Sequence, residues 1–148
     1  MNFPAQNDSK RGTGMIQGDT DAERVVINFF NTLSTGDLDK VRETLHPDAN
    51  WNVLVTVPGA GSYKGREAII NFLAPIRGQF MPGDPKVNID RVFAKGNEVA
   101  VESHSSGFFK NGTEYKNNYC WIVIVKDGKV FEIREYMDSY HVSTLKID

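Results

Sequence analysis

Apolar residues recur every three or four positions in the first half of the chain, which is the period of a helix with one buried face. The clearest such segment spans residues 21–35. Thr20 and Glu23 have the spacing of a capping box at its start, and Gly36 can end it in the left-handed conformation. The pattern therefore predicts a first helix over 21–35.

Two shorter amphipathic segments follow. Asp37 can cap a short second helix whose apolar face runs as far as Leu45, and His46-Pro47 ends it because the residue before proline disfavours helical geometry. A third helix is predicted over 66–77, where Pro75 weakens the last turn.

The rest of the chain has the alternation and turn residues of strands. Residues 50–55 alternate in polarity and predict a strand, and the glycine-rich segment 58–62 after it predicts a loop. Later, three glycine-containing turn signals separate four apolar segments and predict an antiparallel meander. Its strands are expected at 86–94, 98–108, 115–125 and 130–138.

A curved antiparallel sheet has one apolar face to cover, and the three helices are the cover that the sequence offers. The predicted fold class is therefore α+β, with a cone-shaped sheet and three N-terminal helices enclosing one pocket. We expect a single domain over 21–142, a flexible polar tail over 1–20 and a short C-terminal tail over 143–148.

Three segments resemble the nuclear-transport-factor-like superfamily, and within it the SnoaL-like, ketosteroid-isomerase-related proteins. They are FFNTLSTGDLDKVRETLHPDANW, YKGREAIINFL and NNYCWIVIVKDGKVFEIREYMDSYHV. The resemblance implies the cone fold and a pocket for a small molecule. It leaves the reaction open, because this fold hosts isomerases, epoxide hydrolases, cyclases, dehydratases and binding modules.

The resemblance also argues against steroid isomerisation. The three positions that carry proton donors and acceptors in ketosteroid isomerases fall at Phe29, Val53 and Trp121 here, and none of these side chains can play that role. Of the Asp-Arg-Asp set of limonene-epoxide-hydrolase-like enzymes, only the third carboxylate is kept as an acid, at Glu135.

Glu135 is the principal candidate for chemistry. If 126–128 form a three-residue loop, Glu135 shares the core-facing side of the sheet with Trp121; a two-residue loop would place it beside Cys120 instead. We favour the first register because it separates one nearly apolar face from a mixed one. A carboxyl group among apolar side chains has a raised pKa, which suits a general acid or base. Alternatively, the carboxylate is paired with a buried basic group or reaches solvent.

Two further residues are candidates for catalysis. His104 can titrate near neutral pH, but strict alternation along its strand turns it away from the pocket. Tyr119 lies on the same face as Trp121 and could join Glu135. Aromatic residues at period two are also typical of a core. The predicted ligand-binding residues are Phe29, Trp51, Val53, Tyr63, Asn117, Trp121 and Ile133.

Composition narrows the classes of partner. The 148 residues carry a formal charge of −2, which does not favour a nucleic acid, and they hold no apolar run long enough for a membrane span. Cys120 is the only cysteine, the three histidines are far apart and no nucleotide-binding loop is present. We therefore expect a cytoplasmic protein without a metal or other cofactor.

Apolar residues on the predicted outer face of the last strands indicate a second copy of the chain as partner. Ile122, Ile124 and Val130 favour a back-to-back homodimer. Taken together, the sequence predicts a protein that binds a small apolar molecule and performs acid–base chemistry through Glu135, as an isomerase, lyase or hydrolase. The alternative is a non-catalytic ligand-binding or dimerisation module.

Overall fold

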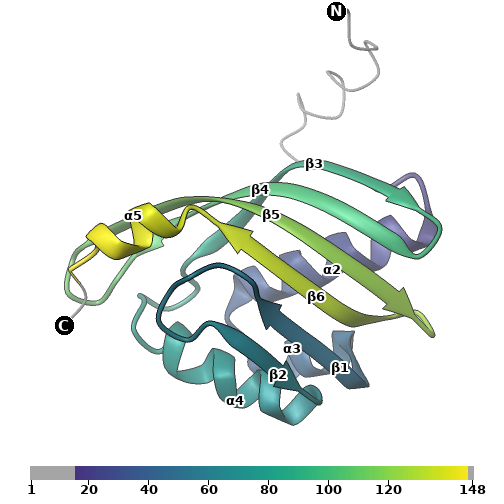
Figure 1. The fold of residues 1–148 in the computed structure, drawn as a ribbon, viewed down its shortest axis with the longest axis horizontal. Helices are drawn as coiled ribbons and strands as arrows, with labels where there is room; N and C mark the ends of the chain where they lie inside the picture. The colour runs from purple at the N-terminus through teal and green to yellow at the C-terminus, as the bar shows by residue number, and fades with distance from the viewer. Residues whose placement is uncertain (1–15, 147–148) are drawn as a thin grey trace, which may run out of the picture.

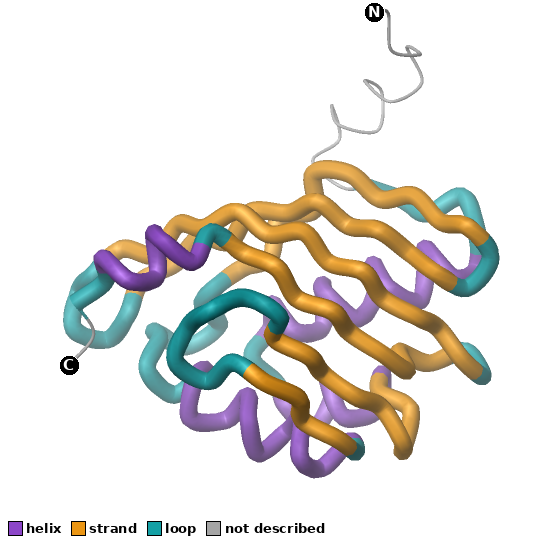
Figure 2. Tube along the Cα trace, viewed as in Figure 1, coloured by secondary structure: helices purple, strands orange, loops and turns teal. Residues whose placement is uncertain are grey.

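A computed structural model describes residues 16–146 of the chain, in which helices and strands occupy most positions. Figures 1 and 2 show one layer of helices against one strongly curved sheet. The helices are α2 (Asp21–Thr35), α3 (Leu38–Thr44), α4 (Arg66–Arg77) and α5 (Ser139–Thr144). The strands are β1 (Leu45–Val53), β2 (Gly61–Lys64), β3 (Lys86–Lys95), β4 (Glu98–Phe108), β5 (Glu114–Lys126) and β6 (Lys129–Met137).

The sheet has the strand order β2-β1-β6-β5-β4-β3. The predicted meander of β3 to β6 is confirmed, while β1 joins it by pairing parallel to β6, so the sheet is mixed rather than purely antiparallel. Helices α2, α3 and α4 lie on one side of it, as Figure 1 shows. The α+β cone expected from the sequence is thus the fold of the described chain.

The predicted helix ends form through the predicted caps. The backbone N–H of Glu23 donates to the hydroxyl of Thr20 over 3.1 Å, and Gly36 ends α2 with a φ of 77°. Asp37 then accepts hydrogen bonds from the first backbone N–H groups of α3. Because these groups have no partner inside their helices, the caps define where the two helices begin.

Three elements differ from the sequence prediction. Leu45 begins β1 instead of ending α3, because it pairs with Val130 of β6. Part of the predicted glycine loop forms β2, which pairs with residues 50–53 of β1. The predicted C-terminal tail contributes to α5, which Asp138 caps and which extends to Thr144, beyond the expected domain end at 142. Residues 1–15 of the tail predicted over 1–20 lie outside the described residues, as do 147 and 148.

The last hairpin reaches the predicted face by a different route. Lys126 pairs with Lys129, so the turn has two residues, Asp127 and Gly128, both with positive φ. An extra residue, Phe131, then interrupts the ladder and restores the register in which Glu135 pairs with Trp121. The two-residue turn pairs Val130 with Val125 on the core side of the sheet, where Val130 is fully buried, so its predicted place on the outer face is wrong.

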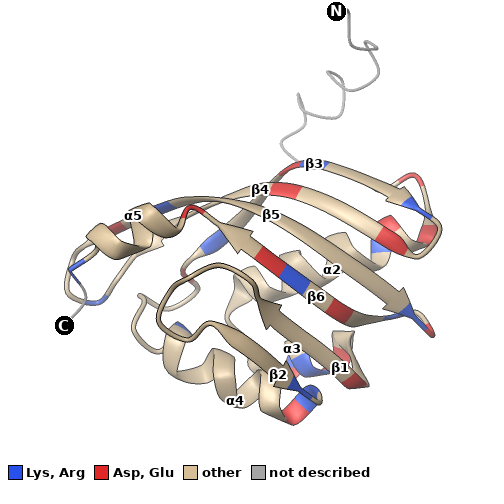
Figure 3. Ribbon diagram, in the orientation of Figure 1, with Lys and Arg blue, Asp and Glu red and all other residues tan. Residues whose placement is uncertain are grey.

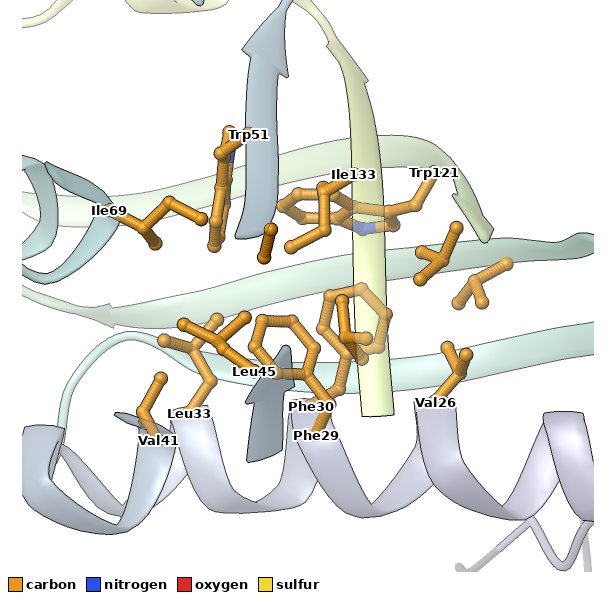
Figure 4. Close-up of a cluster of buried hydrophobic side chains, with 14 of the residues drawn as sticks. Val26, Phe29, Phe30, Leu33, Val41, Leu45, Trp51, Ile69, Trp121 and Ile133 are labelled. Atoms are coloured by element: carbon orange, nitrogen blue, oxygen red, sulfur yellow. The ribbon is translucent and has the colours of Figure 1, made fainter. Parts of the chain in front are cut away.

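The core lies between α2 and the concave face of the sheet, as Figure 4 shows. Phe29 and Phe30 have ring centroids 5.0 Å apart, and Phe30 lies 4.9 Å from the ring of Trp121 across the layer. Both phenylalanines are fully buried. This packing of aromatic rings holds the helical layer at a defined distance from β5 and β6, the strands that carry the candidate site.

Candidate functional site

A cavity of about 450 Å³ lies next to the hydrophobic core, at the end of the helical layer. Its walls come from β5 and β6, the loop after β1, the end of α4 and the C-terminal helix α5. In Figure 2 the loop after β1 lies between α4 and α5. The lining residues are mostly apolar: Val53, Val57, Pro58, Gly59, Phe72, Ile76, Gln79, Phe80, Pro85, Phe109, Tyr115, Tyr119, Glu135, Met137, Val142 and Leu145.

Glu135 supplies the carboxyl group of this cavity. Its side chain projects from β6 opposite Val53 of β1, and the residue is only 7 % exposed. The indole N–H of Trp51 donates to its Oε1 over 2.7 Å. Burial raises the pKa of Glu135 to about 7, although the hydrogen bond from Trp51 opposes the rise. Near neutral pH this carboxyl is therefore present in both protonation states.

The sequence left open whether Glu135 is paired with a basic group. Among residues 16–146, the hydrogen-bond partner of its carboxyl group is the neutral indole of Trp51, and no lysine or arginine forms an ion pair with it. Figure 3 shows the charged positions of β6 in blue and red along its ribbon. Arg134, the residue before Glu135, lies on the other face of β6, with its guanidinium 3.9 Å from a carboxylate oxygen of Glu132. The carboxyl thus lacks a counter-charge and faces a cavity.

Two tyrosines form a second polar group in the cavity wall. The hydroxyls of Tyr115 and Tyr119 lie 2.5 Å apart, and the amide of Asn117 donates to Tyr115 over 3.0 Å. The orientation of that amide is set because its oxygen accepts from the backbone N–H of Asn118. Burial raises the pKa of Tyr119 well above its ordinary value, and the nearby Glu135 adds to the rise. Both tyrosines therefore stay protonated and able to donate near neutral pH.

Of the residues predicted from the sequence, the structure brings Glu135, Tyr119 and Val53 together in the cavity wall. Three other predicted residues do not line the cavity but contact residues that do. Trp51 holds Glu135, Trp121 stacks on Tyr119 with ring centroids 5.0 Å apart, and Asn117 holds Tyr115.

Tyr63 and the remaining predicted ligand contacts lie elsewhere. Tyr63 stacks on Phe72 at 4.0 Å and donates its hydroxyl to the carbonyl of Gly59, so it fixes the glycine loop against α4. Phe29 and Ile133 are fully buried core residues with no exposed surface for a ligand. Their predicted role in binding is corrected on this ground.

His104 lies on the opposite side of the sheet from Glu135. Its Nδ1 is 2.9 Å from a carboxylate oxygen of Asp90, and both side chains are about half exposed. No bulge in β4 turns the residue inward, because β4 and β5 pair without interruption. The structure therefore does not bring His104 into the cavity with Glu135.

The sequence reasoning missed several cavity residues. Tyr115 could have been found, because it continues the alternation of Asn117, Tyr119 and Trp121 toward the start of β5. Phe80 and Phe109 could not, because they come from irregular segments that meet through an isolated bridge. Leu145 follows a helix that the sequence did not predict.

Two further features bear on possible ligands. Within residues 16–146, no group of three or more histidine, cysteine, aspartate or glutamate side chains could hold a metal ion. No helix in the same part of the chain is long and apolar enough to cross a membrane.

Comparison with known proteins identifies relatives at the level of family and fold. A model of the SnoaL-like domain matches residues 26–133. No curated protein matches the chain.

Three solved structures are similar in fold. TerC, co-crystallised with polyporic acid, is 17 % identical with a TM-score of 0.75, over 85 % of this chain and 98 % of TerC. A putative SnoaL-like polyketide cyclase from Jannaschia sp. CCS1 is 23 % identical with a TM-score of 0.71, over 88 % and 96 %. An LEH-like epoxide hydrolase of M. tuberculosis is 24 % identical with a TM-score of 0.70, over 83 % and 86 %.

Proposed function

This chain belongs to the SnoaL-like domain family, and from that premise we propose that it binds a small, largely apolar molecule and transfers a proton to or from it through Glu135. One observation carries the proposal. A carboxyl group with a pKa of about 7 and no counter-charge faces a cavity of about 450 Å³ that is otherwise apolar or uncharged. A volume of this size is that of a typical small-molecule site.

The proposed chemistry is general acid–base catalysis. A group whose pKa lies near the working pH can both accept a proton and return it, so Glu135 suits an isomerisation, an elimination or a hydrolysis. The hydroxyls of Tyr115 and Tyr119 share one hydrogen bond between them. Because a pair of hydroxyls has two protons and one is used in that bond, the other can be donated to an oxygen or nitrogen of the bound molecule. We therefore propose that Tyr119 acts together with Glu135. His104, on the other face of the sheet, has no part in this chemistry.

Proteins of similar fold support the proposal that this chain binds a small molecule. TerC was co-crystallised with polyporic acid, and two other similar structures are described as a polyketide cyclase and an epoxide hydrolase. Identities below 25 % do not transfer a substrate to this chain. They agree with a pocket for an organic molecule in a fold that supports several reactions.

Filling the cavity tests whether it is the binding site. We expect Val57→Trp to weaken the binding of 1-naphthol about tenfold or more, because Val57 lines the cavity and the indole would occupy the ligand's volume. Leu54→Trp is the matched control, since Leu54 is 43 % exposed and does not line the cavity. Titration followed by tryptophan fluorescence measures both. Equal affinities in the two variants, or no binding to the unmodified protein, would remove the support for this site.

We also propose that the chain forms a homodimer through the outer face of the sheet. Phe93, Ala100 and Ile122 pair across β3, β4 and β5, and Phe93 is 55 % exposed. An apolar row of this kind favours contact with a like surface. Val130, one of the residues on which the dimer prediction first rested, is in the core and contributes nothing to this face.

Charge on that row should disrupt the dimer. Sedimentation equilibrium at micromolar concentration is expected to give twice the chain mass of 16.6 kDa, and Ile122→Lys should shift the protein toward monomer. Asn28→Lys, at an exposed position of α2 on the other side of the sheet, is a control that should leave the mass unchanged. If the unmodified protein sediments as a monomer at all concentrations, the proposed homodimer is refuted.

A further inference from the structure

The cavity contains a negative group without a positive partner. Glu135 is the single residue with a formal charge among the described residues that line it. Its Oε1 accepts the Trp51 indole N–H, and Oε2 has no hydrogen-bond partner in the described chain. An ionised carboxylate in such a place is stabilised by little besides one neutral donor. A cationic group beside Oε2 would supply the positive charge that the lining residues do not provide.

Aromatic rings make up much of the same wall. Phe72, Phe80, Phe109, Tyr115 and Tyr119 all line the cavity. Phe80 and Phe109 stack with ring centroids 4.1 Å apart, and Tyr115 meets each of them edge-on. The faces of aromatic rings attract cations, and this attraction strengthens where water is excluded. Aromatic walls and an unpaired carboxylate are therefore two independent features that favour the same kind of ligand charge.

We propose that the cavity selects an apolar molecule that carries one positive charge, such as a tertiary or quaternary amine, with the cationic nitrogen beside Oε2 of Glu135 and its alkyl groups against the aromatic wall. This inference rests on the proposed function, because it names the class of ligand for the same cavity. An anionic ligand would meet the like charge of the carboxylate. A neutral ligand would bring no charge to stabilise that carboxylate.

A cationic ligand would also act on the proposed base. Its charge stabilises the ionised form of Glu135, so binding converts a partly protonated carboxyl into a carboxylate ready to accept a proton. A cationic ligand would thus increase the fraction of Glu135 that is ionised and able to act as a base. A neutral molecule of the same shape would not.

Two probes of the same shape separate charge from size. Benzyltrimethylammonium and neopentylbenzene differ by the replacement of the cationic nitrogen with carbon. We expect the unmodified protein to bind the ammonium at least about tenfold more tightly than the hydrocarbon. In Glu135→Gln this preference should fall severalfold while the affinity for neopentylbenzene stays the same, which also shows that the variant is folded and its cavity intact.

Proton release provides a second measurement that needs no variant. At pH 6, where Glu135 is mostly protonated, binding of benzyltrimethylammonium should release about 0.4 proton if the carboxylate contributes a tenfold preference, and more if it contributes more; at pH 8.5 binding should release almost none. The other titratable groups facing Glu135 are Tyr115 and Tyr119, whose raised pKa values keep them protonated throughout this range, and His141 of α5 contacts Tyr115. Calorimetry in two buffers of different ionisation enthalpy measures the release, and Glu135→Gln should abolish it.

The outcomes distinguish this inference from the proposed function. Equal binding of both probes by the unmodified protein would overturn the selection of a cation and leave an apolar binding cavity standing. A preference for the ammonium that persists undiminished in Glu135→Gln, or binding without proton release at pH 6, would also overturn it. Failure of both probes to bind would instead count against the cavity as a binding site at all.

Discussion

Glu135→Gln is expected to be more stable than the unmodified protein at pH 8, by about 3 kcal/mol in the free energy of unfolding, and to be of similar stability at pH 4. The same change should lower any proton-transfer activity by a factor of about 10² to 10⁴, because glutamine cannot exchange a proton. Its amide oxygen can still accept the hydrogen bond from Trp51.

The direction of the stability change follows from the pKa of Glu135. Burial raises it from 4.5 to about 7 in the folded protein. Below pH 4.5 the carboxyl is protonated in both the folded and the unfolded state and has no effect on the balance. As the pH rises from 4.5 to 7, the unfolded state ionises first and is favoured, so the folded protein loses stability over this window. Glutamine does not ionise and is free of this loss.

Urea denaturation at several pH values between 4 and 8 measures the difference. All other titrating groups are shared by the two proteins, so the change with pH in the difference between them reports Glu135. A constant difference across the range would contradict the raised pKa. A loss of roughly 3–5 kcal/mol in Glu135→Gln at pH 7 would show that the carboxylate is paired with a buried cation after all.

Phe29→Ala is expected to lower the free energy of unfolding by about 3–5 kcal/mol. The ring of Phe29 is fully buried, and its centroid lies 5.0 Å from that of Phe30 and 6.0 Å from that of Trp51. Truncation would leave a cavity in the layer that positions Trp51, the partner of Glu135. The expected result is a large loss of stability and not a selective loss of ligand binding.

Phe108→Ala removes the same atoms from a residue that is 49 % exposed, and should change the stability by no more than about 0.5 kcal/mol. Urea denaturation of both variants, with a 1-naphthol titration of the folded protein, makes the comparison. A stable Phe29→Ala that no longer binds 1-naphthol would favour the ligand contact predicted from the sequence over the core position found in the structure.

Elements governed by local chemistry could be predicted from the sequence. The spacing of apolar residues in α2, its capping by Thr20 and its end at Gly36 depend on neighbours within a few positions, and all three were found. Two segments whose structure depends on a distant partner were not predicted as strands. Leu45 and the residues of β2 become strands because β6 and β1 lie beside them, and nothing local distinguishes β2 from a glycine loop.

The candidate site likewise contains residues that could be predicted from local sequence and residues that could not. Alternation along β5 and β6 was enough to place Glu135 and Tyr119 on the same face. The turn at Asp127 has two residues where three were predicted, and the bulge at Phe131 compensates for the missing one. The other walls of the cavity could not be predicted, because their residues come from loops and from α5, whose positions depend on packing across the whole fold.

A titration of the Glu135 carboxyl by ¹³C NMR tests the central claim most directly. In protein labelled at the glutamate side-chain carboxyl carbon, the resonance of Glu135 is the one missing from the spectrum of Glu135→Gln. We expect its chemical shift to change with a midpoint at about pH 7, as a buried carboxyl without a counter-charge requires. A midpoint at or below 4.5 would show a solvated or paired carboxylate and would contradict its role as an acid–base group in this cavity.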